Sequence, residues 1–222
     1  MSLAERSVTI ARGILKRYGS AKTKKRLWDQ EFSGSHWDFI DNTAGDCVYP
    51  YLEKYAKNGA ILDLGCGPGN TANELANSAY QTYLGVDISE AALVKARRRT
   101  EECGRAAKNY FVQGDFINYE PRQTFDLILF RESMYHVPLS KVKPMLERYS
   151  SFLKKDGVFV VRMVTLSGRG ERPKRRLTAM VEIIKSECEV LEHNEHGEFR
   201  ATVIVFRPKN GLDHSLADLV RR

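Results

Sequence analysis

The sequence has few of the features that mark secreted, membrane-spanning or metal-binding proteins. It holds four cysteines in 222 residues and no CxxC pair, which argues against a zinc site or a disulfide framework and favours free thiols. Its apolar runs fall well short of the roughly 20 residues that span a bilayer. The N-terminus lacks the continuous apolar core of a signal peptide. We therefore expect a cytoplasmic protein with no metal and no membrane partner.

The composition suits one folded domain and leaves the partner open. Hydrophobic residues make up 42% of the chain, enough for a full core, and 222 residues suit one α/β domain with a short appendage. The net charge is +7. Such a basic balance is compatible with nucleic acid, a membrane surface or an anionic small molecule, so charge alone does not choose among them.

The hydrophobic pattern from residue 59 onward predicts strands alternating with helices. Strands are expected at 60–64, 82–86, 109–113, 125–130, 157–164, near 188–193 and at 201–207, and helices at 1–20, 70–79, 89–102, 139–153 and 174–186. Asn70 or Thr71 is expected to cap the second of these helices and Ser89 the third. This order predicts an α/β fold with a doubly wound, mostly parallel sheet. We divide the chain into a helical, aromatic lid at 1–50, a domain at 51–210 and a tail at 211–222.

The stretch ILDLGCGPGN, residues 61–70, follows the first predicted strand directly. It places Gly65, Gly67 and Gly69 at every second position after Asp63, with Cys66 between the first two glycines. Glycine at this density is costly unless the backbone bends sharply or another group comes very close to it. Ligands of doubly wound sheets bind at the carboxyl ends of the strands, which is where this loop is expected.

Acidic residues follow the next two predicted strands. Asp87 ends the second strand, 22 residues after Gly65, and Asp115 follows the third. A carboxylate in the place of Asp87 can accept hydrogen bonds from both ribose hydroxyls of a nucleoside. Asp115 can accept from an adenine amino group, and Ile88 and Phe116 can flank the adenine ring. The strand ends therefore predict a ligand that contains adenosine.

The glycine spacing separates two adenosine cofactors. A nicotinamide dinucleotide normally needs GxGxxG, and Asn70 stands where its third glycine belongs. The pattern here is DxGxGxG, which resembles motif I of the class I S-adenosylmethionine-dependent methyltransferases. The resemblance extends to Asp87, to the pair Gly114–Asp115, to FDLILFRES at 125–133 and to the predicted late hairpin, and so covers roughly residues 55–207.

The resemblance implies a seven-stranded sheet with an antiparallel late strand and a cofactor, S-adenosylmethionine, that is held without a metal. Asp63 and the backbone around Cys66, from Gly65 to Gly67, would hold its methionine part. Arg131 would lie beside that part or beside the substrate. The adenosine would be held by Asp87 at the ribose, Ile88 and Phe116 at the ring faces and Asp115 at the amino group.

The sequence also suggests residues for the acceptor side. His136 follows the fourth strand and is the first choice for a general base, with Tyr135 beside it as a second, although a histidine there can equally only line the pocket. Trp28 and Trp37 lie in an aromatic stretch that is expected to cover the substrate. The basic run RGERPKRR, residues 169–176, can steer a substrate carboxylate or phosphate, or form a solvated helix start.

The compact chain favours methyl transfer to a small molecule, with an anionic one among the options and oxygen, nitrogen or sulfur as acceptor atom. The fourth strand ends in RESM and not in the Asn/Asp-Pro-Pro-aromatic motif typical of enzymes that methylate base amino groups. Methylation of RNA or protein, a non-catalytic cofactor-binding scaffold and a nicotinamide dehydrogenase stay open as alternatives. The sequence leaves monomer and homodimer equally open.

Overall fold

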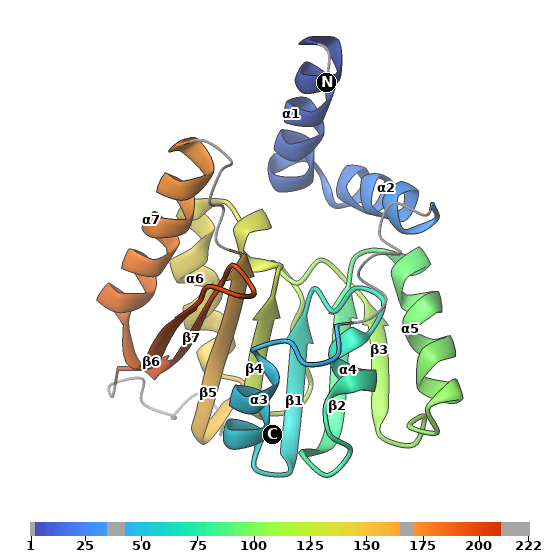
Figure 1. Ribbon diagram of the computed structural model, residues 1–222, viewed down its shortest axis with the longest axis vertical. Helices are drawn as coiled ribbons and strands as arrows, with labels where there is room; N and C mark the ends of the chain where they lie inside the picture. The colour runs from blue at the N-terminus through green and yellow to red at the C-terminus, as the bar shows by residue number, and fades with distance from the viewer. Residues whose placement is uncertain (1–2, 35–42, 165–170, 210–222) are drawn as a thin grey trace, which may run out of the picture.

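The computed structural model describes residues 3–34, 43–164 and 171–209, and these form one α/β unit under a pair of N-terminal helices (Figure 1). The helices are α1 (Leu3–Tyr18), α2 (Ala21–Phe32), α3 (Tyr49–Ala56), α4 (Asn70–Glu74), α5 (Glu90–Glu102), the 3₁₀ turn η2 (Met134–His136), α6 (Leu139–Ser150) and α7 (Glu171–Glu187). The strands are β1 (Gly59–Leu64), β2 (Tyr80–Asp87), β3 (Asn109–Gln113), β4 (Phe125–Arg131), β5 (Leu153–Val164), β6 (Cys188–His196) and β7 (Ala201–Pro208).

The sheet has seven strands in the order β3-β2-β1-β4-β5-β7-β6. Strands β1 to β5 pair in parallel, whereas β7 is antiparallel to both β5 and β6. The doubly wound, mostly parallel sheet predicted from the sequence, with its late antiparallel strand, is therefore confirmed.

Alternation along β4 shows how the sheet builds two cores. Ile128 and Phe130 pack with side chains of α6 and α7 on one face, and Leu127 and Leu129 pack with α3 and α4 on the other. All four side chains are fully buried. A strand with four consecutive apolar residues, 127–130, suits the centre of a sheet that is covered on both faces.

Several predicted boundaries were wrong. The helix predicted at 70–79 ends at Glu74, because Leu75 takes an extended conformation. Its N-cap is Gly69, with φ of +78°, and neither Asn70 nor Thr71. Strand β5 begins at Leu153, four residues before the predicted start, because Leu153 pairs with Phe125 of β4. The prediction of Ser89 as N-cap of α5 is confirmed, since its side chain accepts a hydrogen bond from the Ala92 amide.

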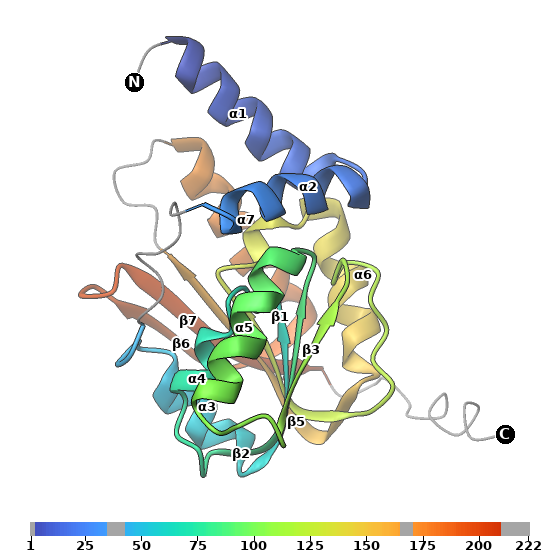
Figure 2. The same cartoon turned by 90° about the vertical axis from the view of Figure 1, so that its right-hand side faces the viewer.

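Helices α1 and α2 lie across the edge of the sheet where the parallel strands end (Figures 1 and 2). The N-cap Ser20 separates them and accepts from the Thr23 amide. Leu27 and Phe32 of α2 are buried against the domain. None of the helices in the described ranges is long and apolar enough to cross a membrane.

Candidate functional site

The glycine loop after β1 has the geometry that its sequence predicts. Gly65, Gly67 and Gly69 all have positive φ, at +85°, +53° and +78°. A Cβ on Gly65 would lie 2.5 Å from Cβ of Ser133, and one on Gly69 would lie 2.8 Å from Cβ of Ala96. Positive φ favours glycine at all three positions, and the close neighbours exclude a side chain at Gly65 and Gly69 as well. The loop therefore turns sharply at the carboxyl edge of the sheet, and its amides bond within the protein, those of Gly65 and Cys66 to the Val86 carbonyl.

Asp63 is a buried acid with an unused oxygen. Its side chain sits at the end of β1 and is 1% exposed. The Tyr83 hydroxyl donates to Oδ2 at 2.5 Å, while Oδ1 has no hydrogen-bond partner among the described residues. Burial raises the pKa of this carboxyl to about 6. A buried oxygen without a donor is costly, and a ligand ammonium or N–H group would satisfy it.

Asp87 joins the end of β2 to the glycine loop. Its Oδ2 accepts from the Gly67 amide at 2.9 Å, and its Oδ1 accepts from the Ser89 amide at 2.8 Å. Burial raises the pKa of this carboxyl as well, to about 6. Each carboxylate oxygen has a second lone pair for a ligand hydroxyl. The neighbouring Ile88 is half-buried.

Helix α2 is held over this edge by two acidic side chains. Lys24 donates to Oδ2 of Asp115 at 3.0 Å. Oδ1 of Asp29 accepts from the Ser89 hydroxyl at 2.8 Å and from the Ala91 amide at 3.2 Å, at the start of α5. The sequence predicted an open Asp115 that meets adenine. In this structure Asp115 instead holds Lys24, which comes from 91 residues away.

Phe116, which the sequence analysis placed at the adenine ring, lies beside the glycine loop. One of its ring atoms lies 3.5 Å from the position that a Cβ on Gly65 would take. Its ring packs edge-on against Phe130, with the centroids 6.0 Å apart. Phe32 of α2 approaches Gly67, since its ring tip lies 3.7 Å from where a Cβ on Gly67 would be. Aromatic rings from both the domain and α2 therefore border the loop.

Arg131 lies at the end of β4 but is held by protein groups. It donates to Asp46 at 3.1 Å and to the Tyr49 hydroxyl at 3.0 Å. Arg162 of β5 also donates to Asp46, at 3.1 Å. Burial opposes ionisation of Asp46, but Arg131 and Arg162 outweigh it and hold the pKa of Asp46 below its usual value. The sequence analysis missed Asp46, because no local spacing links it to an arginine 85 residues away.

The two residues predicted for catalysis lie on η2, under the N-terminal helices. The rings of His136 and Trp28 meet edge-on with centroids 4.9 Å apart. Burial and the nearby charges of Lys16 and Arg17 lower the pKa of His136 to about 3, so the imidazole is neutral. The Tyr135 hydroxyl donates to Glu132 at 2.9 Å. Trp28 therefore reaches the predicted catalytic segment, whereas Trp37 falls outside the described residues.

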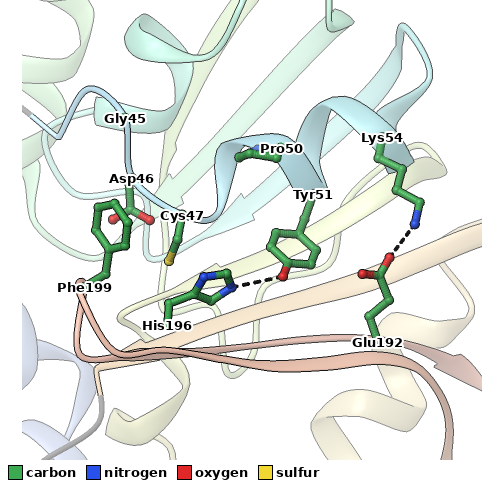
Figure 3. A pocket seen from close by; sticks show the side chains of 9 residues that line it. All are labelled: Gly45, Asp46, Cys47, Pro50, Tyr51, Lys54, Glu192, His196 and Phe199. Atoms are coloured by element: carbon green, nitrogen blue, oxygen red, sulfur yellow. Dashed lines mark hydrogen bonds and ion pairs between the residues drawn. The ribbon is translucent and has the colours of Figure 1, made fainter.

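A separate cavity lies between the start of α3 and the β6–β7 hairpin (Figure 3). It has a volume of about 460 Å³, and Asp46 and Cys47 line it. On its wall Tyr51 and His196 share a hydrogen bond of 3.0 Å, and Lys54 pairs with Glu192 at 2.6 Å. In the described part of the chain, no cluster of His, Cys, Asp or Glu is arranged to hold a metal ion.

The seven-stranded sheet, the glycine loop and the buried acids at the ends of β1 and β2 together define a class I methyltransferase fold. The residues present fit the methionine and ribose ends of S-adenosylmethionine, because Asp63 offers an orphaned acceptor and Asp87 two partly used oxygens. The chain belongs to the methyltransferase domain family, which matches residues 56–214. S-adenosylmethionine is the cofactor of this family, as the sequence resemblance implied.

Individual relatives agree with the family and differ in what they act on. The chain is 38% identical over 104 residues to trans-aconitate 2-methyltransferase of Enterobacter sp. (strain 638), a match over 46% of this chain and 38% of that protein. It is 29% identical over 102 residues to the sterol 24-C-methyltransferase of Eremothecium gossypii, over 46% of this chain and 27% of that protein. The chain thus spans less than half the length of these two relatives.

A solved structure supports the fold over most of the chain. The N-methyltransferase NodS from Bradyrhizobium japonicum WM9, in complex with S-adenosyl-L-homocysteine, superposes with a TM-score of 0.65 at 16% identity. The superposition covers 84% of this chain and 98% of NodS. Together with the family match, it confirms the class I methyltransferase fold predicted from the sequence.

Proposed function

We propose that this protein is a methyltransferase that moves the methyl group of S-adenosylmethionine to a small molecule by in-line displacement. The observation that carries the proposal is the pair of buried acids, Asp63 and Asp87, on either side of a glycine loop with positive φ. The cofactor, when bound, supplies an activated methyl group on a sulfonium. The protein then has to position two ligands and exclude water.

Each residue of the proposed cofactor site has a distinct task. Oδ1 of Asp63 accepts from the amino end of the methionine, and the backbone from Gly65 through Cys66 to Gly67 surrounds that end. Asp87 accepts from the ribose hydroxyls. Ile88 and Phe116 flank the adenine, and Asp115 accepts from its amino group once Lys24 has moved aside. Arg131 acts at a distance, because Asp46 and Tyr49 already hold its guanidinium.

The acceptor is proposed to bind under α1 and α2, beside Trp28, His136 and Tyr135. The N-terminal lid, proposed as residues 1–50 over a domain at 51–210, leaves room for a small molecule better than for a folded polymer. The two curated relatives act on trans-aconitate and on a sterol, both of them small molecules. Oxygen, nitrogen and sulfur acceptors, an RNA or protein substrate and a non-catalytic role remain alternatives that assays must separate.

His136 is proposed to face the acceptor. Its imidazole is neutral and has a free site for a proton, but a pKa of about 3 makes it a weak base. An acceptor that carries a negative charge would raise this pKa, because it would offset the charges of Lys16 and Arg17. His136 would then serve as a base only when such an acceptor is bound.

Titration calorimetry against S-adenosylhomocysteine tests the cofactor assignment, with NADH as a control ligand. We expect micromolar binding of the first ligand and none of the second. The variant Asp87→Asn should lose binding by about tenfold or more, because the amide nitrogen replaces a charged acceptor. Asp156→Asn, an exposed change in β5, is the matched control. Undiminished binding by Asp87→Asn would remove the ribose assignment, and binding of NADH alone would remove the proposed function.

A further inference from the structure

Positive charges gather around the proposed acceptor site from two parts of the chain. Lys16 lies over the ring of Trp28, with Nζ 3.8 Å from the centroid, and Trp28 in turn meets His136. On the other side of η2, Arg176 of α7 donates to the Tyr135 carbonyl at 3.2 Å and to the Val137 carbonyl. Figure 1 shows the start of α7 at the same end of the molecule as α1 and α2.

Two cations near the proposed acceptor site, Arg17 of α1 and Arg176 of α7, have no acid to balance them. Glu31 pairs with Lys16 at 2.5 Å and with Arg12 at 3.3 Å. Among the described residues, no carboxylate lies within ion-pair distance of Arg17 or Arg176, and Nε of Arg17 is buried without a hydrogen-bond partner. Burial and the charge of Arg17 both lower the pKa of Arg176. Like charges held together in a half-buried place are unfavourable unless an anion completes the site.

We infer that Arg17 and Arg176 bind a carboxylate group of the methyl acceptor, next to Trp28 and His136. This inference rests on the proposed function and gives the acceptor its chemical class, a small carboxylic acid. The planar guanidinium presents paired N–H donors that match the two oxygens of a carboxylate. Trp28 and the neutral His136 supply flat, weakly polar surface for the carbon skeleton.

The site is shared between the lid and the domain. Arg17 belongs to α1, whereas Arg176 belongs to α7 and is fixed to η2 by its bonds to backbone carbonyls. An acid that bridges the two arginines therefore holds α1 against the domain. The cavity beside α3 lacks this signature, because its cation, Lys54, is already paired with Glu192.

Calorimetry with trans-aconitate as a tricarboxylate probe tests the inference, with and without S-adenosylhomocysteine. The trimethyl ester of the same skeleton is the uncharged control. We expect the acid to bind and the ester not to bind. Arg17→Met and Arg176→Met should each weaken binding by about tenfold or more, since each removes a charged hydrogen-bond donor. Arg17→Lys keeps the charge but loses the paired donors, so it should weaken binding less than Arg17→Met does.

The matched control is Arg98→Met, an arginine on α5 whose side chain is 69% exposed, which should leave acid binding unchanged. Thermal unfolding identifies any variant that has lost its fold. If Arg176→Met disturbs η2, the Arg17 variants decide whether the arginines bind the acid. The inference is overturned if the wild type does not bind the acid, or if acid binding is the same in wild type, Arg17→Met and Arg98→Met. Affinity for S-adenosylhomocysteine should be equal in all variants. If the acid binds but S-adenosylhomocysteine does not, the proposed function is contradicted and the arginine site is not.

Discussion

Gly65 shows at the scale of one residue how the loop constrains the sequence. Its φ of +85° disfavours any side chain, and a Cβ would collide with Ser133. Gly45 provides a comparison, because its φ is +80° and a Cβ there would meet nothing within 4 Å. The two glycines share a left-handed backbone conformation and differ only in the room available for a Cβ atom.

We therefore predict that Gly65→Ala destabilises the protein more than Gly45→Ala does. Both changes should cost about 1–2 kcal/mol from the left-handed backbone, and Gly65→Ala about 1–3 kcal/mol more from overpacking. Urea unfolding of both variants measures the difference. Equal losses would mean that Ser133 moves away freely and that the loop is less tightly packed than the distances indicate.

The buried acids lead to a prediction about pH. Asp63 and Asp87 have pKa values of about 6 in the folded protein, above the ordinary value of 3.8. Both must be ionised to accept hydrogen bonds from the cofactor with full strength. As the pH falls from 7 to 5, affinity for S-adenosylhomocysteine should fall, by up to about tenfold per pH unit below 6 for each acid involved.

Calorimetry from pH 5 to pH 8 measures this dependence, and Asp87→Asn should make it shallower. A constant dissociation constant over that range would contradict the prediction. Stability is a poorer readout of these titrations, because the two acids and His136 change it in opposite directions as the pH falls. The raised pKa of the two acids stabilises the folded protein as the pH falls from 6 toward 3.8, while the lowered pKa of His136 removes stability between 6.5 and about 3.

At the scale of elements, α2 covers the proposed cofactor site and also competes with the cofactor for one of its residues. Lys24 occupies the oxygen of Asp115 that is proposed to meet the adenine amino group. Both side chains of this pair are largely buried, at 11% and 13% exposed, so the contact persists better than a surface ion pair. Cofactor entry then requires that α2 shifts or that Lys24 turns away.

Replacing Lys24 by methionine should therefore tighten binding of S-adenosylhomocysteine by about three- to tenfold, because a competing ion pair of about 1 kcal/mol is removed. Lys22→Met is the matched control, since Lys22 is exposed on the same helix. Titration calorimetry of the two variants and the wild type gives the comparison. Weaker binding by Lys24→Met would show that this lysine contacts the ligand itself.

Elements with a strong local pattern were predictable, and their ends were less so. The order of strands and helices followed from hydrophobic periodicity and from caps such as Ser89. Helix α4 was predicted too long, because the stretch LANSA after Glu74 has helix-compatible residues but the chain turns at Leu75. Helix α3, with the sequence YPYLEKYA, was missed, because the sequence analysis assigned no helix or strand between the lid and the strand expected at 60–64.

At the scale of the whole molecule, the resemblance to motif I located the strand ends but not the contacts between distant segments. The pairs Lys24–Asp115 and Arg131–Asp46 join residues 91 and 85 apart, and no local spacing encodes them. They changed the interpretation of Asp115 and Arg131, each of which the sequence presented as an open ligand-binding group. Pattern analysis therefore located the glycine loop and the strand ends, but not the contacts that α2 makes with them.

The position of α1 and α2 has a consequence for how the chain folds as it is synthesised. Leu27 and Phe32 are buried in the finished protein, at 4% and 7% exposed, against segments that follow much later in the sequence. The 91 positions from Lys24 to its partner Asp115 take on the order of 10 s to translate at about 5–20 residues per second. During that time the apolar face of α2 has no domain to cover it. Helix α2 is therefore synthesised well before the surface that covers it.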